Sequence, residues 1–213
     1  MTGMDQMNLF GEAAAPVRDG LALLRDFALP EAEAILAAIV SVEAAAPFRH
    51  MVTPGGHAMS AAMTNCGVGW VADRRGYRYS DIDPESGALW PQIPAVVREL
   101  AVAAAGEAGF AFAPDGCLIN RYEPGAKMGL HQDKNEGDPS APIVSVSLGL
   151  PMMFQFGGTQ RTDPVERMTL SHGDVVVWGG PSRFAYHGVL TLKEGTHPVV
   201  GRRRLNLTIR QAR

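Results

Sequence analysis

The sequence predicts a mainly β protein with flanking helices, an α+β fold in which an N-terminal helical layer covers a C-terminal jelly-roll-like core. Three observations favour this fold class. Short runs with alternating or β-branched character recur after Gly116, turn-forming residues separate them, and two amphipathic helical patterns precede them. Several short strands at such spacing are typical of a sandwich or a closed β architecture.

Composition indicates one folded domain. The chain has 213 residues, of which 46% are hydrophobic and 19% charged, and this is enough apolar material to bury a core. The formal net charge of −3 excludes a global basic excess, so any nucleic-acid contact must use a local basic surface. The two cysteines, Cys66 and Cys117, exclude a disulfide scaffold and a cysteine-built zinc module.

The first 20 residues are rich in Met, Ala and Gly and lack periodicity. We expect a flexible N-terminal arm over residues 1–20 and a single domain over residues 21–213. The start has no signal-peptide pattern, and no stretch reaches the roughly 18 apolar residues that a membrane span needs. We therefore expect a cytoplasmic monomer without a membrane partner.

Two helices are expected in the first half. Pro30 suits the first turn of a helix whose apolar stripe includes Ile35 and Ile39, and Pro47 ends it. A second helix follows Pro94 and ends at Gly106. Residues 47–92 contain many turn formers and predict hairpins or long loops.

Seven strands are expected after Gly116, which places the jelly-roll core in residues 116–213 and the helices and loops in residues 21–115. The strands are Cys117–Tyr122, Ile143–Leu150, Met152–Phe156, Arg167–Leu170, Val175–Trp178, Phe184–Val189 and Leu205–Arg210.

Two His-x-Asp triplets are candidates for metal binding, because residues i and i+2 of a strand point to the same face. His131 and Asp133 lie at an expected strand end, whereas His172 and Asp174 belong to a turn that leads into a strand. His187 is the natural third ligand. Two histidines and one carboxylate suit Fe(II) with open coordination positions, although a lone triplet also fits an exposed strand end.

The last strand has one apolar and one polar face, because Arg204, Asn206, Thr208 and Arg210 alternate with apolar residues. This pattern fits an ordinary amphipathic strand with its polar face in water. It also fits a closed barrel in which the arginines face inward and clamp a dicarboxylate. Asn120 and Tyr122 share a face of another strand and are candidates to contact the same acid.

Together, these residues resemble the AlkB family of Fe(II)- and 2-oxoglutarate-dependent dioxygenases. The resemblance covers nearly the whole chain after the first few residues. Its other motifs are Met51–Gly56, Met63–Gly67, Pro124–Lys127, Leu130–Lys134, Ala141–Pro151, Phe154–Gly158 and His172–Gly180.

The resemblance implies a double-stranded β-helix (jelly-roll) core and oxidative dealkylation of DNA bases such as 1-methyladenine and 3-methylcytosine. This direct-reversal repair consumes O2 and releases formaldehyde, succinate and CO2. The resemblance also implies that iron is held by His131, Asp133 and His187. It implies that 2-oxoglutarate is held by Asn120, Tyr122, Arg204, Asn206 and Arg210. We expect Arg204 at the distal carboxylate and Arg210 nearer the metal.

The expected partner is alkylated DNA, with RNA as an alternative. Candidate substrate contacts are Thr53, Met63, Trp70, Tyr77, Lys127, Lys134, Asn135 and Arg161. The chain departs from the family pattern twice, since Asn135 replaces an expected acidic residue and His57 an expected tyrosine. A protein or small-molecule substrate remains an alternative, as does a non-catalytic jelly-roll module with structural zinc.

Overall fold

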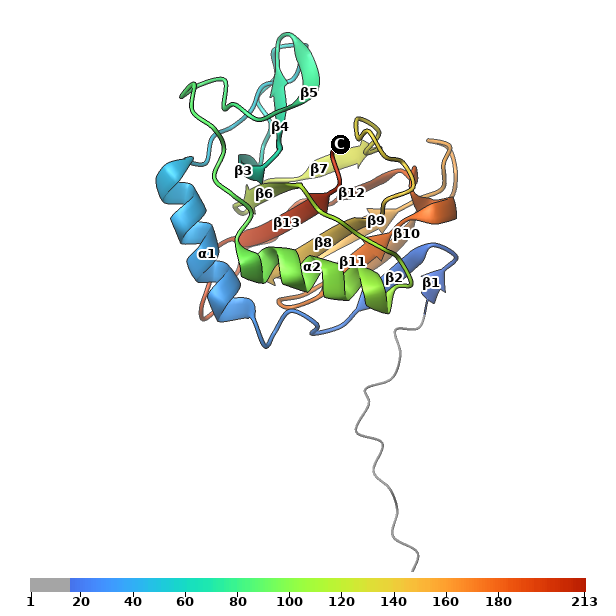
Figure 1. Ribbon diagram of the computed structural model, residues 1–213. Helices are drawn as coiled ribbons and strands as arrows, with labels where there is room; N and C mark the ends of the chain where they lie inside the picture. Colours follow the sequence, from blue (N-terminus) through green and yellow to red (C-terminus); the bar gives the residue numbers. More distant parts are fainter. Residues whose placement is uncertain (1–15) are drawn as a thin grey trace, which may run out of the picture.

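The computed structural model describes residues 16–213, which form two stacked antiparallel sheets and a helical layer (Figure 1). Helices α1 (Ala32–Ala45) and α2 (Ala95–Glu107) lie against one side of the larger sheet. Both helices occupy the expected segments, and α2 begins directly after Pro94. Pro30 lies just before α1 rather than in its first turn, because Glu31 is the N-cap residue.

The larger sheet has seven strands in the order β1-β2-β11-β8-β13-β6-β3. The strands are β1 (Pro16–Arg18), β2 (Leu21–Leu24), β3 (Ala62–Gly67), β6 (Gly116–Tyr122), β8 (Ile143–Gly149), β11 (Val175–Trp178) and β13 (Arg204–Arg210). The smaller sheet has the order β10-β9-β12-β7. Its strands are β7 (Met128–His131), β9 (Met152–Phe156), β10 (Glu166–Leu170) and β12 (His187–Val189).

Successive side chains along the strands of the larger sheet point to opposite faces, so a hydrophobic cluster lies on each face of that sheet. In β11, Val175 and Val177 belong to the cluster that includes the apolar faces of both helices. Val176 and Trp178 belong to the second cluster, together with Phe154 of the smaller sheet. Inward-facing positions of the larger sheet are therefore enclosed between the two sheets.

Three sequence-based boundaries need correction. The expected arm over residues 1–20 includes β1, which pairs with β2; residues 1–15 lie outside the described part. The core is not confined to residues 116–213, because β1, β2 and β3 complete the larger sheet. The expected strand Phe184–Val189 is limited to His187–Val189, because a 3-10 helix at Gly180–Ser182 and a turn at residues 183–184 precede it.

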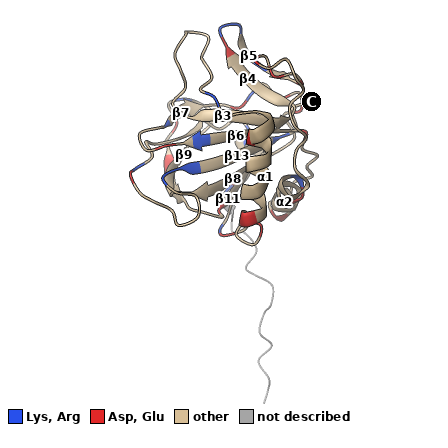
Figure 2. Cartoon of the chain, turned by 90° about the vertical axis from the view of Figure 1, so that its left-hand side faces the viewer, with Lys and Arg blue, Asp and Glu red and all other residues tan. Residues whose placement is uncertain are grey.

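The region expected to hold hairpins contains β4 (Gly69–Asp73) and β5 (Gly76–Ser80), which pair only with each other. This β4–β5 hairpin projects from the body of the molecule next to β3 (Figure 1). Its turn, Arg74-Arg75, carries positive charge at the tip (Figure 2). No helix in the described residues is long and apolar enough to cross a membrane.

A buried ion pair joins the segment before β3 to the loop after β5. Asp83 is only 3% exposed and accepts hydrogen bonds from Arg49 at 2.5 and 3.0 Å. We expect Asp83→Ala to lower the free energy of unfolding by about 3 kcal/mol, because it removes the buried carboxylate and leaves the guanidinium with only the exposed Glu85 as a countercharge. Asp81→Ala breaks the exposed pair with Arg213 and should cost less than about 1 kcal/mol. Equal losses in urea denaturation would contradict this expectation.

Candidate active site

Two strands and a loop of the smaller sheet bring the His131, Asp133 and His187 side chains together. His131 ends β7, Asp133 follows it, and His187 begins β12, where it is the register partner of His131. Asp133 Oδ1 lies 3.7 Å from His131 Nε2, and Oδ2 lies 3.7 Å from His187 Nε2. Pairing of β7 with β12 therefore closes the gap of more than 50 residues between the two histidines.

Both imidazoles have a free nitrogen that faces the carboxylate. His131 Nδ1 lies 2.9 Å from the Gly129 carbonyl and His187 Nδ1 lies 3.0 Å from the Ala185 carbonyl. A carbonyl only accepts hydrogen bonds, so each Nδ1 carries the proton and each Nε2 offers a lone pair. A backbone carbonyl on the second ring nitrogen is the usual arrangement behind a metal-bound histidine.

The surroundings of Asp133 and His187 lower the pKa of both side chains, which favours their unprotonated, metal-binding forms. Burial would raise the pKa of Asp133, but the charge of the Arg210 guanidinium outweighs it and holds that pKa well below its usual range. Burial lowers the pKa of His187 to about 4. Ligand atoms about 2.1 Å from one ion lie at most about 4.2 Å apart, so the 3.7 Å separations fit a metal ion.

A cavity of about 490 Å³ opens between the sheets and contains this triad. The polar face of β13 points into it, since Arg204, Asn206, Thr208 and Arg210 all line it. The polar face of this strand therefore faces inward, as the barrel interpretation predicts, and the interpretation with its polar face in water is wrong. Buried apolar side chains of Leu118, Phe154 and Trp178 complete the walls.

Arg204 is a buried cation with no carboxylate partner in the part of the chain that the structure describes. It is 1% exposed, and its Nε and Nη1 atoms have no hydrogen-bond partner in the described residues. Only Nη2 is engaged, through a 2.9 Å bond to Ser147 Oγ, and burial lowers the pKa of the guanidinium below its usual value. Two unpartnered nitrogen donors on a buried side chain that lines the cavity fit an anionic ligand, most simply a carboxylate.

The amide and hydroxyl groups expected beside Arg204 are present but play different parts. Asn206 is fully engaged by the protein, because its Nδ2 donates to Ser145 Oγ and the Val146 carbonyl while its Oδ1 accepts from Asn120 and Thr208. Tyr122 is 2% exposed, and burial raises its pKa to about 12, so its hydroxyl remains a donor. Asn206 thus orients Asn120, whereas Tyr122 faces the cavity.

Arg210 lies at the metal end of the strand, as expected. Its Nη2 and Nε donate to Asp133 Oδ2 at 2.7 and 3.2 Å. The two arginines of β13 therefore differ in kind: Arg210 is neutralised by protein carboxylates, and Arg204 is left for a ligand.

The mouth of the cavity carries most of the expected substrate contacts. Trp70 and Tyr77 stack across the β4–β5 hairpin with centroids 5.5 Å apart and planes 15° apart. Both line the cavity, as do Met63, Lys127, Lys134, Asn135 and Arg161. Thr53 does not line it; its Oγ1 accepts a hydrogen bond from the backbone of His57 instead. Among the described residues, Asp133 is the only acidic side chain in the lining.

Sequence reasoning missed several polar residues around this site. Ser145 and Ser147 lie on β8 and contact Asn206 and Arg204, but serine in an apolar strand is no clear signal. Gln132 lines the cavity and donates to the carbonyls of Thr159 and Phe184. Arg183 reaches Asp133 from a turn 50 residues away, and no local pattern indicates that contact.

Comparison with known proteins supports one family. The model of the 2OG-Fe(II) oxygenase superfamily matches residues 20–210. Alpha-ketoglutarate-dependent dioxygenase AlkB of Escherichia coli is 54% identical over 97% of this chain and 98% of its own length. The AlkB homolog of Caulobacter vibrioides is 44% identical over 84% of this chain and 81% of its own length. The solved structure of OsALKBH1 superimposes with a TM-score of 0.83 and 30% identity, covering 93% of this chain and 99% of that one.

Proposed function

The chain belongs to the 2OG-Fe(II) oxygenase superfamily and is an Fe(II)- and 2-oxoglutarate-dependent dioxygenase, and from this premise we propose that it removes alkyl groups oxidatively from damaged bases in DNA. The observation that carries the proposal is one cavity that holds the metal triad, an unpaired buried arginine and an aromatic, basic mouth. The names of the similar AlkB proteins support the same reaction class.

Each part of the cavity has a role in this proposal. His131, Asp133 and His187 bind Fe(II), and Arg204 binds a carboxylate of 2-oxoglutarate with help from Tyr122 and Asn120. Bound iron and 2-oxoglutarate supply, with O2, an oxidant for the C–H bond of an N-alkyl group. Arg210 keeps Asp133 ionised and oriented, and the apolar walls exclude water from the reacting atoms.

The mouth suits a nucleotide whose base has left the helix stack. An enzyme that reacts with a base inside a duplex must extrude it, and a methylated base that cannot pair lowers that cost. Trp70 and Tyr77 offer stacking faces, worth up to about 2 kcal/mol for a desolvated cation. Lys127, Lys134 and Arg161 place positive charge where phosphates would lie.

Mass spectrometry of a methylated oligonucleotide tests the proposal directly. A single-stranded DNA carrying 1-methyladenine should lose the mass of one CH2 group and yield formaldehyde, only when Fe(II), 2-oxoglutarate and O2 are all supplied. A matching RNA runs in parallel, and faster conversion of the RNA would move the assignment from DNA to RNA. An unchanged mass in both nucleic acids would contradict the proposal.

Asn135 should limit activity on cationic lesions. It is exposed at the cavity mouth and carries no charge, whereas a carboxylate there would attract a cationic base. We expect Asn135→Asp to raise kcat/KM on 1-methyladenine by about fivefold, equivalent to about 1 kcal/mol, and to leave the neutral 3-methylthymine unimproved. An unchanged ratio between the two lesions in a side-by-side panel would contradict this expectation.

A further inference from the structure

The carboxylate of Glu136 lies at the centre of a buried ion network next to the metal site. Its side chain is 3% exposed, and Oε2 accepts from Arg183 at 3.1 Å. Its Oε1 accepts from the Tyr79 hydroxyl at 2.6 Å and lies 3.2 Å from Arg210 Nε. Glu136 does not line the cavity, so the direct contacts of the proposed reaction do not account for it.

The same two guanidiniums also hold Asp133. Arg210 binds its carboxylate at 2.7 Å, and Arg183 donates to its backbone carbonyl at 2.8 Å. Arg183 is 2% exposed and donates further to the Ala141 carbonyl, so it is fixed in place. Glu136 therefore shares both of its cationic partners with Asp133, the carboxylate of the metal triad.

The charge balance of Arg210 depends on this sharing. Its ion-pair partners among the described residues are Asp133 and Glu136. If Glu136 were neutral, Arg210 would rely on Asp133 alone and would compete with a metal ion for that carboxylate. Partners of this kind typically change metal affinity by about 10- to 100-fold when they are replaced.

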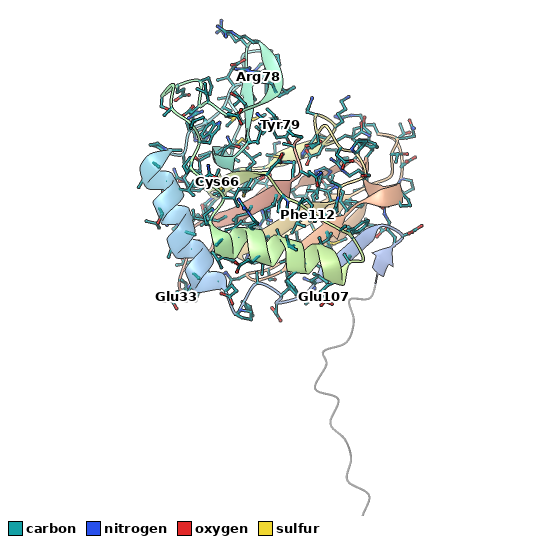
Figure 3. All side chains as sticks on the ribbon, viewed as in Figure 1. Glu33, Cys66, Arg78, Tyr79, Glu107 and Phe112 are labelled. Atoms are coloured by element: carbon teal, nitrogen blue, oxygen red, sulfur yellow. The ribbon has the colours of Figure 1, made fainter. Side chains whose placement is uncertain are left out.

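Tyr79 connects the network to the β4–β5 hairpin, at a position closer to the sheets than its neighbour Arg78 (Figure 3). It is two residues from Tyr77 on β5 and so shares its face. Burial raises the pKa of Tyr79, so its hydroxyl stays protonated and donates to Glu136. The strand that presents Tyr77 at the cavity mouth is thus hydrogen-bonded to the carboxylate that balances Arg210.

We propose that Glu136 and Arg183 are positioning residues that orient Asp133 for metal binding, and that Tyr79 transmits metal occupancy to the β4–β5 hairpin. Metal binding fixes Asp133, and through Arg183 and Arg210 this restricts Glu136. The Tyr79 hydrogen bond then persists for more of the time, and local opening of the hairpin becomes rarer. The description of the hairpin as base-binding rests on the proposed function, but its link to the metal does not.

Titration calorimetry of the metal-free full chain with Mn(II), in the absence of nucleic acid, tests the first part. Glu136→Gln should weaken Mn(II) binding by about tenfold or more. Asp174→Asn is the matched control, because it neutralises another buried carboxylate, which is 1% exposed and paired with Arg25 at 2.6 Å. It should leave Mn(II) affinity within about twofold of the original. Unchanged affinity in Glu136→Gln, or an equal loss in both variants, would overturn the proposal.

Hydrogen exchange of the same samples tests the link to the hairpin. Mn(II) should slow exchange of β4 and β5 amides in the unaltered protein. Tyr79→Phe should abolish that slowing while Mn(II) affinity stays within about twofold, and it remains informative if Glu136→Gln does not fold. Metal-dependent slowing that survives Tyr79→Phe, or that is absent from the unaltered protein, would overturn the link. Failure of the oligonucleotide assay would change neither readout, so the two proposals fail separately.

Discussion

Turnover should fall by at least roughly a thousandfold in His187→Ala, because one of three metal ligands is lost. The protein should remain folded. His187 is neutral in the buried site, where its pKa is about 4, so its removal leaves a cavity without an unpaired charge. Folding stability should therefore fall by only about 1–3 kcal/mol.

His172→Ala is the matched control, since His172 heads the second His-x-Asp triplet and lies outside the cavity lining. Product formation and circular dichroism of both variants provide the measurement, and the control should turn over at close to the original rate. Near-normal turnover of His187→Ala would remove it from the triad. Asp133→Ala is a poorer probe, because it leaves Arg210 with one countercharge and should cost about 3–5 kcal/mol of stability.

Arg204→Met should weaken binding of 2-oxoglutarate by at least about 30-fold, equivalent to about 2 kcal/mol or more. The same change should stabilise the ligand-free protein. Arg204 is a buried cation with two unpartnered nitrogens, and replacing such a group by an apolar side chain of similar length removes a desolvation cost. We therefore expect Arg204→Met to lower the affinity for 2-oxoglutarate and to raise the free energy of unfolding of the ligand-free protein.

Urea denaturation with and without 2-oxoglutarate and metal measures both effects. Without ligand, Arg204→Met should be more stable than the original protein. With saturating 2-oxoglutarate, the original protein should be the more stable of the two, because the ligand binds its folded state and not that of the variant. Arg202→Met is the control, since Arg202 is exposed and pairs with the exposed Glu194, and it should change neither quantity. A variant that loses stability and keeps affinity would show that Arg204 has a structural role only.

The positions of most helices and strands were predictable, because they depend on the order of residues within each segment. The apolar stripe of α1, the run that forms α2 and most strands after Gly116 follow from hydrophobic period and turn residues. The elements that the prediction missed depend on pairing with other strands. β1 is a strand because it pairs with β2, and β3 is a strand because it pairs with β6. Residues 184–186, in turn, are kept out of β12 by the turn that precedes them.

The sequence by itself determined which side chains are able to bind a metal and an acid, because residue type and strand alternation place His131 beside Asp133 and put the polar residues of β13 on one face. Only the tertiary structure decided that this face is buried and that His187 closes the triad. It also decided that Arg204 has no carboxylate partner among the described residues while Arg210 has two. The reason is physical: alternation sets the side of a strand from which a side chain projects, but burial and charge compensation depend on what the rest of the chain packs against that side.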